Sequence, residues 1–402
     1  MEYTPRTDGF YPVLRELADN APDFAAPLER ARAALARDHL SPEDFAALLS
    51  PHAAPLLEDM ARRAHAETLR HFGRSVQLFA PLYLANVCTN RCVYCGFHAG
   101  RRIRRKILKP HEIEVEAKAM ADMGLRRVLV LTGDAPKVTG ADYIAEGVSI
   151  VARHIPSVGI EVQALTEEEY AKVAKAGADA MTMFQETYDE TLYPGLHPAG
   201  PKSCFTFRLD APHRAALGGM RGLTLGALLG LTDWRRDLFH TAMHGVWLAR
   251  RFPEADISFS LPRLRPPSTE CAAGKAPDFS GLAVSDKEFV QALTALRCFL
   301  PHAGITMSSR ESAFMRDNLV PLGVTRISAG VRTSVGGYTE PIEENPDPVQ
   351  FVIDDPRSVR QMREALAKLG YTAVGADWIF PAGGDLPLSQ GLHRSLGLES
   401  TP

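Results

Sequence analysis

Three cysteines lie close together in the segment Cys88-Thr-Asn-Arg-Cys92-Val-Tyr-Cys95. This C-x3-C-x2-C spacing lets three thiolates from one loop converge on a compact metal centre. A zinc site would need a fourth ligand, which His98 could supply, but no second C-x2-C pair and no His-x3-5-His pair follows. An iron-sulfur cubane held by three thiolates keeps one iron open to a further ligand, and an open iron favours chemistry over simple electron transfer. The spacing therefore favours an iron-sulfur cluster over zinc or over three buried structural cysteines.

The elements that must position this loop are visible from about Val76 onward, where short apolar, β-branched runs alternate with longer amphipathic stretches. The apolar runs predict eight strands, at 76–87, 127–131, 159–164, 180–184, 223–229, 257–261, 304–308 and 325–329. The helical stretches include 112–123, 141–154, 167–176, 233–252 and 286–299. Eight strands are the number that closes a parallel barrel, so we predict an α/β fold of the (β/α)8 TIM type.

Two extensions flank the predicted barrel, which we place at residues 76–345. Residues 1–75 are predicted as a helical N-terminal extension in which one helix starts at Ser41, a good cap followed by Pro42. Residues 346–402 are predicted as a C-terminal extension with a helix at 356–369, a short strand at 371–374 and a loosely ordered tail.

The composition is that of an ordinary globular protein. The 402 residues carry a formal net charge of -3 and are 45% hydrophobic, which argues against a disordered chain and against a highly basic nucleic-acid binder. The longest nearly apolar run, 222–231, is too short to span a membrane, and residues 1–9 have no apolar core of the signal-peptide kind. We expect a cytoplasmic protein.

Polar residues follow the predicted strands where a parallel barrel carries its chemistry, at the carboxyl ends. Besides the cysteine loop these residues are Thr132, Asp134, Gln163, Gln185, Glu186, Arg263, Arg265, Ser309, Arg310, Glu311 and Ser328. We expect them to share one face of the barrel with the cysteines.

The cysteine motif, with Tyr94 before its last cysteine, resembles the signature of the radical S-adenosylmethionine (SAM) superfamily. The surrounding segments 81–86, 95–97 and 101–108 resemble the 2-iminoacetate synthases (ThiH), the tyrosine lyases of thiamine thiazole biosynthesis. Further matching segments lie at 161–163, 185–188, 207–209, 226–231, 262–266, 309–312 and 336–338. The resemblance covers about residues 40–377.

This resemblance implies a [4Fe-4S] cluster on Cys88, Cys92 and Cys95, whose open iron binds SAM. One electron from the cluster would cleave SAM to methionine and a 5'-deoxyadenosyl radical. Charged and polar strand-end groups suit the amino-acid part of SAM. By family position we assign the SAM contacts to Tyr94, Thr132, Asp134, Glu186 and Arg208, with Gln163 as a contact to the SAM ribose or to the substrate.

The implied substrate is L-tyrosine, cleaved between Cα and Cβ to 2-iminoacetate (dehydroglycine) and p-cresol. Arg310 offers the bidentate guanidinium that a substrate carboxylate favours, and Tyr83 and Ser328 lie where related lyases contact the amino acid. Alternatively, Arg310 pairs structurally with Glu311 or Asp317. The implied partners are a thiazole synthase and a flavodoxin-like reductant.

A basic run at 101–106 holds five Lys or Arg residues. We interpret it as a solvated face or as a docking site for the acidic reductant. It lacks interleaved aromatic residues, and the net charge is negative, so nucleic acid is not an expected partner. His240 and His244 and the scattered Cys204, Cys271 and Cys298 are predicted to be structural.

Three rival functions stay open. Two are related lyases: the tryptophan lyase of nosiheptide biosynthesis and the hydrogenase maturase that also cleaves tyrosine. The maturase carries extra C-terminal cysteines, whereas this sequence has none after Cys298. The third is a non-catalytic metal-binding module, which would leave the strand-end groups haphazard.

Overall fold

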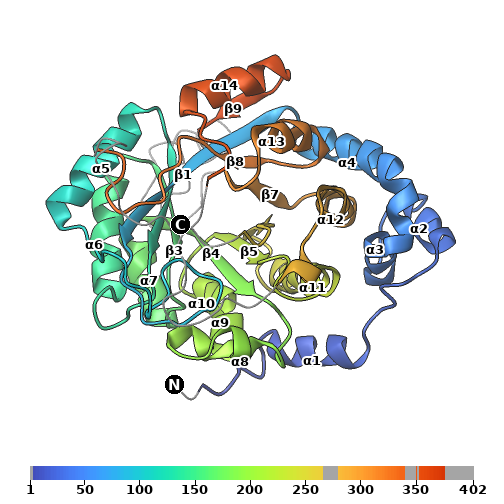
Figure 1. The fold of residues 1–402 in the computed structure, drawn as a ribbon, viewed down its shortest axis with the longest axis horizontal. Coiled ribbons are helices and arrows are strands. Elements are labelled where there is room, and N and C mark those ends of the chain that lie inside the picture. Colours follow the sequence, from blue (N-terminus) through green and yellow to red (C-terminus); the bar gives the residue numbers. More distant parts are fainter. Residues whose placement is uncertain (1–2, 266–278, 340–349, 351–352, 376–402) are drawn as a thin grey trace, which may run out of the picture.

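The computed structural model describes residues 3–265, 279–339, 350 and 353–375. Eight parallel strands form a closed barrel (Figure 1), in the order β2-β3-β4-β5-β6-β7-β8-β1 with β1 also paired to β2. The strands are β1 Ser75–Ala85, β2 Arg127–Thr132, β3 Ser157–Glu161, β4 Ala178–Glu186, β5 Gly222–Ala227, β6 Asp256–Ser260, β7 Gly304–Met307, β8 Arg326–Ser328 and β9 Thr372–Val374. The predicted (β/α)8 fold and its eight strands are confirmed.

Helices surround the barrel. They are α5 Pro110–Asp122, α6 Ala141–Ala152, α7 Glu167–Lys175, α8 Tyr193–Leu196, α9 Phe205–Leu209, α10 Ala211–Leu217, α11 Trp234–Arg251, α12 Asp286–Phe299, α13 Ala313–Leu319 and α14 Val359–Lys368. Short 3-10 turns lie at η2 Pro201–Ser203, η3 Ser280–Leu282 and η4 Val320–Leu322. Among the described residues, no helix is long and apolar enough to cross a membrane.

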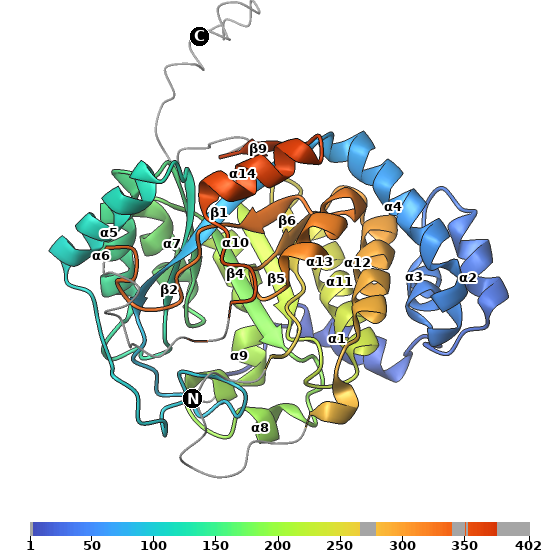
Figure 2. The ribbon, with the colours of Figure 1, turned by 45° about the horizontal axis from the view of Figure 1, so that its top comes forward.

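The N-terminal segment is helical and covers one side of the barrel. It consists of α1 Tyr11–Asp19, α2 Leu28–Leu35, α3 Pro42–Leu49, η1 Pro51–Leu56 and α4 Leu57–Phe72. Helix α4 packs on α12, and Figure 2 shows α2 and α3 outside this pair. The predicted helix start is confirmed, because the Ser41 hydroxyl accepts from the Asp44 N–H at 3.2 Å and the Asp44 carboxylate accepts from the Ser41 N–H.

The barrel strands are buried on both faces, as expected where helices cover a parallel sheet. Every residue of β5 is buried. A Cβ at Gly226 would lie 2.6 Å from the Phe184 ring and 2.5 Å from the Ser260 carbonyl oxygen, so a larger residue has no room there. The interior is therefore tightly packed around the space that remains open.

The strand boundaries differ from the predicted ones by up to three residues, and the ends of the first and third strands are two examples. The third strand ends at Glu161 rather than at 164, since its pairing with β2 ends there, and the Gln163 side chain that follows bonds to the loop after β2. The first strand ends at Ala85, after a register shift against β2 that begins at Tyr83. Helix α14 and strand β9 lie where the C-terminal extension was predicted, with β9 paired to the start of β1. The predicted tail after 375 and the boundary at 345–346 lie outside the described residues.

Candidate active site at the carboxyl ends of the barrel strands

The cysteine loop follows β1 and is held by its neighbours. The Thr89 N–H donates to the Asp134 carbonyl oxygen at 2.8 Å, which ties the loop to the end of β2. The buried side chain of Asn90 then makes two bonds: its Nδ2 donates to Asp134 Oδ2 at 2.7 Å, and its Oδ1 accepts from the Lys202 N–H at 3.0 Å. One asparagine thus joins the cysteines to the segments that follow β2 and β4.

Lys202 and Glu186 form an ion pair beside this loop, with both side chains largely buried. The Lys202 ammonium nitrogen also lies 5.7 Å from the centre of the Tyr94 ring, and the Tyr94 hydroxyl is 2.7 Å from His197 Nε2. Glu186 has a φ of 72°, the one positive φ outside glycine in the described chain. Strained backbone conformations of this kind are common at functional sites. Here the strained residue is Glu186 itself, whose carboxylate lies at the end of β4.

Arg208 completes this charged cluster from α9. Its Nε donates to the Phe184 carbonyl oxygen at 2.7 Å. Burial lowers the pKa of its guanidinium, but Tyr193, Asp134 and Glu186 face it and together raise that pKa above the ordinary value. The structure therefore brings Tyr94, Asp134, Glu186 and Arg208, all expected from the sequence, to one end of the barrel.

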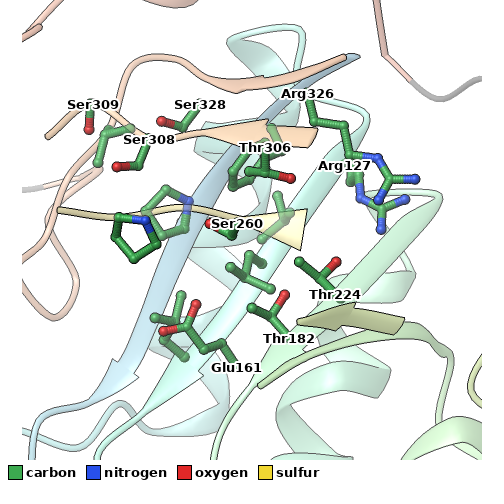
Figure 3. Close-up of a pocket in the computed structure, with 18 of the residues that line it drawn as sticks. Arg127, Glu161, Thr182, Thr224, Ser260, Thr306, Ser308, Ser309, Arg326 and Ser328 are labelled. Atoms are coloured by element: carbon green, nitrogen blue, oxygen red, sulfur yellow. The ribbon is translucent and has the colours of Figure 1, made fainter. Parts of the chain in front are cut away.

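A cavity of about 890 Å³, including its open end, lies within the barrel. Figure 3 shows hydroxyl groups along its wall and Glu161 at the opposite end from Arg127 and Arg326. Tyr83, Arg310 and Ser328 line the same cavity, as expected of substrate-binding residues. The apolar part of the wall includes Phe79, Pro81, Val128, Leu129, Leu131, Phe184 and Pro262. Small-molecule sites combine such apolar walls with a few convergent polar groups.

The carboxylates that the sequence offered as structural partners of Arg310 hold other arginines. Glu311 accepts from Arg263 Nε at 2.9 Å and from Arg265 Nη2 at 3.1 Å. Asp317 is paired with Arg357 at 2.9 Å. Arg310 instead interacts electrostatically with two residues of the cavity, Tyr83 and Glu161.

Comparison with known proteins identifies the family. Residues 82–242 match the Radical SAM superfamily, and residues 260–372 match the Biotin and Thiamin Synthesis associated domain. The chain is 38% identical over 355 residues to the 2-iminoacetate synthase of Salmonella typhimurium (strain LT2), which covers 88% of this chain and 91% of that protein. For the 2-iminoacetate synthase of Escherichia coli (strain K12) the identity is 37% over the same coverage. The chain belongs to the 2-iminoacetate synthase family.

Solved structures agree with this family. The chain is similar to the crystal structure of HydG, a maturase of the [FeFe]-hydrogenase, with a TM-score of 0.80 and 29% identity over 92% of this chain and 81% of that one. As a radical SAM enzyme of the 2-iminoacetate synthase family, the protein is a carbon-carbon lyase that uses a [4Fe-4S] cluster and SAM.

The cysteine loop of this family member fits a cluster chemically. Burial, helped by the charge of Asp134 and by the Cys95 thiol, raises the pKa of Cys88 to about 12. Burial likewise raises the pKa of Cys92 and Cys95, so thiolates here need a cationic partner such as iron. Within the described residues, the three sulfurs are not arranged around a common metal position.

Two orphaned hydroxyls fit the family's ligands. Thr132 Oγ1 at the end of β2 and Ser328 Oγ at the end of β8 are buried and have no hydrogen-bond partner in the described chain. Buried polar atoms in native proteins are nearly always bonded, so these two hydroxyls are available to hydrogen-bond a ligand. Gln163 differs, because its amide accepts from the Ala135 N–H at 3.0 Å and donates to the Thr139 carbonyl oxygen at 3.2 Å. It supports the loop that follows β2, and its predicted contact with SAM or substrate stays a prediction.

The basic run at 101–106 is not a uniformly solvated face. The prediction of a solvated face was wrong for two of its residues, Arg101 and Arg105. Arg101 is buried, and Arg105 donates to the backbone carbonyls of Asn86, Phe97 and His98. These carbonyls belong to the cysteine loop and its flanks. Arg102 and Arg104 remain exposed.

His244 and Cys298 have structural surroundings, as predicted. His244 is buried, stacks on Phe10 at a ring distance of 4.2 Å and bonds to the Tyr188 hydroxyl at 3.0 Å. Cys298 is buried in α12. Cys271 lies outside the described residues.

Three residues of the site were not singled out from the sequence. Glu161 belonged to a matching segment and is the last residue of a strand, which is a usable signal. Asn90 lies between the cysteines, where a polar residue is available to bond with neighbouring loops. Lys202 follows no strand directly, and only its position beside Glu186 reveals it.

Proposed function

We propose that this protein cleaves the Cα–Cβ bond of L-tyrosine to 2-iminoacetate and p-cresol, with consumption of SAM, to supply the thiazole ring of thiamine. Similarity to two 2-iminoacetate synthases over nearly the whole chain carries this proposal. The match to the Biotin and Thiamin Synthesis associated domain supports the biosynthetic role.

The residues divide into two groups along the site. Cys88, Cys92 and Cys95 would hold the cluster, with SAM contacted by Tyr94, Thr132, Asp134, Glu186 and Arg208, and Gln163 would contact the SAM ribose or the substrate. When bound, the cluster and SAM supply the one-electron chemistry that removes a hydrogen atom from the substrate.

The second group binds the amino acid. Arg310 would bind the carboxylate through two parallel N–H donors, and the orphaned hydroxyl of Ser328 is available for a further hydrogen bond. The Tyr83 hydroxyl donates to Gln350 Oε1 at 2.6 Å, which orients its ring in the cavity wall. Apolar neighbours such as Phe79 and Phe184 exclude water from the reacting bond.

Anaerobic turnover tests the proposal. The reconstituted protein is mixed with SAM, dithionite and L-tyrosine, and p-cresol and 5'-deoxyadenosine are quantified, with Cys92→Ala as the control. Both products are expected only from the intact triad. Deoxyadenosine without p-cresol would contradict tyrosine as substrate, and L-tryptophan is then the next substrate to test. Neither product from protein that holds its cluster would contradict the lyase assignment.

Two protein partners are part of the proposal. A thiazole synthase would receive 2-iminoacetate, and a flavodoxin-like protein would deliver the electron, at a surface that includes the exposed Arg102 and Arg104. Charge reversal in Arg104→Glu is expected to slow cluster reduction at low salt, since complementary charge accelerates association. Unchanged reduction kinetics would contradict this docking site. Both partners imply a cytoplasmic location, as predicted from the sequence.

The transfer to the thiazole synthase has its own test. The two proteins are separated by a membrane that passes small molecules, and the thiazole yield is compared with that of the mixed proteins. Direct transfer predicts a lower yield across the membrane, and an undiminished yield would contradict it.

A further inference from the structure

We infer that Glu161 binds the α-ammonium group of the substrate amino acid, while Arg310 binds the carboxylate. The inference rests on the proposed function, because it assigns a second recognition group for the amino acid that the enzyme would cleave. It makes the cavity a zwitterion site with one acidic and one basic residue.

The position of Glu161 is the first observation. It is the last residue of β3, and its carboxylate points into the cavity (Figure 3). It is the one acidic side chain among the described residues that line this cavity. Arg310 and Tyr83 line the cavity too, and both interact electrostatically with Glu161.

The second observation is that Glu161 lacks a bonded partner. In the described part of the chain its carboxylate makes neither a hydrogen bond nor an ion pair, whereas the neighbouring carboxylates are engaged. Glu186 is paired with Lys202, Asp134 accepts from Asn90, and Glu311 is held by Arg263 and Arg265. Glu161 is partly buried, and a carboxylate that has lost part of its contact with water and has no bonded partner favours a cationic ligand.

The surrounding charges favour the same ligand. Burial, together with the negative charge of Glu186, raises the pKa of Glu161 to about 7. The positive charges of Arg310, Lys202 and Arg208 act in the opposite direction and lower this pKa. A substrate ammonium would add the positive charge that keeps this carboxylate ionised. An α-amino acid brings such a group together with a carboxylate for Arg310.

The other two arginines of the cavity, Arg127 and Arg326, do not compete with Arg310 for the substrate carboxylate. Arg326 lies at the start of β8, donates to the Ser258 hydroxyl at 2.6 Å and is paired with Asp256. Arg127 lies at the start of β2 and donates to Ser157 at 3.2 Å. Both lie at the far end from Glu161 in Figure 3.

The test compares three ligands by calorimetry on the reconstituted enzyme with SAM and no reductant, so that no turnover occurs. L-Tyrosine carries both charges, 3-(4-hydroxyphenyl)propionate lacks the ammonium group, and tyramine lacks the carboxylate. The variants are Glu161→Gln, Arg310→Gln and, as a matched control, Glu168→Gln on the exposed face of α7.

The wild type and Glu168→Gln are expected to bind L-tyrosine at least about tenfold more tightly than either analogue, as befits charged hydrogen bonds. Glu161→Gln should lose the preference over the propionate and keep the preference over tyramine. Arg310→Gln should show the reverse pattern. Glu161→Asp retains the charge and should keep part of the first preference, which provides a second variant if Glu161→Gln folds poorly.

Two outcomes separate this inference from the proposed function. A wild type that cleaves tyrosine, together with a Glu161→Gln variant that still prefers tyrosine over the propionate, would overturn the inference alone. A wild type that holds its cluster and binds none of the three ligands would overturn both.

Discussion

Arg316 and Asp355 form an ion pair in which both side chains are fully buried. Arg316 also donates from Nη2 to the carbonyl oxygen of Ser328, so the pair supports the end of β8 beside the cavity. Asp355 belongs to the C-terminal segment, and its carboxylate further accepts from Arg357. The extension beyond the barrel therefore takes part in holding Ser328, a residue of the cavity wall, in place.

Removal of this carboxylate should destabilise the protein strongly. In Asp355→Ala the buried guanidinium of Arg316 loses its counter-charge, which lowers the free energy of unfolding by about 3–5 kcal/mol. Thermal melting measures the loss. Glu364→Ala on the exposed face of α14, where Glu364 lies 3.7 Å from Arg360, is the control and should change stability by less than about 1 kcal/mol. Equal effects of the two substitutions would contradict a structural role for the buried pair.

Asn90→Ala should weaken the cysteine loop. The Asp134 carboxylate and the Lys202 N–H would lose their bonds to the asparagine amide, at a cost of about 1–3 kcal/mol for each buried group left unpaired. The measurements are the melting temperature and the iron content after reconstitution, and both should fall. The control is Asn318→Ala, whose exposed amide bonds to the Phe314 carbonyl oxygen of its own helix. If Asn90→Ala matches the wild type in both measurements, the loop does not depend on this side chain.

Cys92→Ala should prevent normal cluster assembly, because three thiolates are needed to hold three of the four irons and only two thiolates would remain. The iron and sulfide content and the visible absorbance report the loss. Cys298→Ala is the matched control, since Cys298 lies buried in α12 away from the barrel mouth. We expect the control to retain its iron. A Cys92→Ala protein with full iron content would contradict the assignment of the triad.

Arg310→Lys should raise the KM for L-tyrosine by about tenfold or more, with a smaller effect on kcat. A lysine ammonium is a point charge and lacks the planar fork that grips a carboxylate at two positions. Steady-state kinetics under anaerobic conditions separate the two constants. Arg360→Lys, at an exposed position of α14, controls for general effects. A KM unchanged from the wild type would show that Arg310 does not bind the substrate carboxylate.

Glu161→Gln should make the protein more stable at high pH. Burial raises the pKa of Glu161 from 4.5 to about 7 in the folded state, so between these values the folded protein binds more protons than the unfolded chain. Stability of the wild type therefore falls as pH rises through this window, and the glutamine variant escapes a loss of about 3 kcal/mol.

The melting temperatures of Glu161→Gln and wild type, compared from about pH 4 to 8.5, check this prediction. The difference should be small at about pH 4, should widen as pH rises and should level off above about pH 8. Asp237, whose pKa burial also raises to about 7, is present in both proteins and so cancels from the comparison. A difference that does not vary with pH would contradict the shifted pKa of Glu161.

Local patterns in the sequence were sufficient for the strands and for the cysteine triad. The triad is a short-range feature, because eight consecutive residues place three thiols in one loop whatever surrounds them. The eight strands were predictable because a strand covered by helices reads as a short apolar run, as in the fully buried β5. Strand-end residues such as Asp134, Glu186 and Arg310 then followed, since parallel strands present their carboxyl ends on one face.

Pairings between distant segments required the closed barrel. Glu161 and Arg310 are far apart in the chain and line one cavity only because the strands that carry them belong to the same ring. Lys202 meets Glu186 because the segment after β4 folds back over the barrel mouth. The same holds for Arg105, which reads as surface charge in the sequence but bonds to three carbonyls of the folded loop. Residue type and spacing thus determine which groups are available for chemistry, whereas packing determines which of them lose their contact with water and must find a partner.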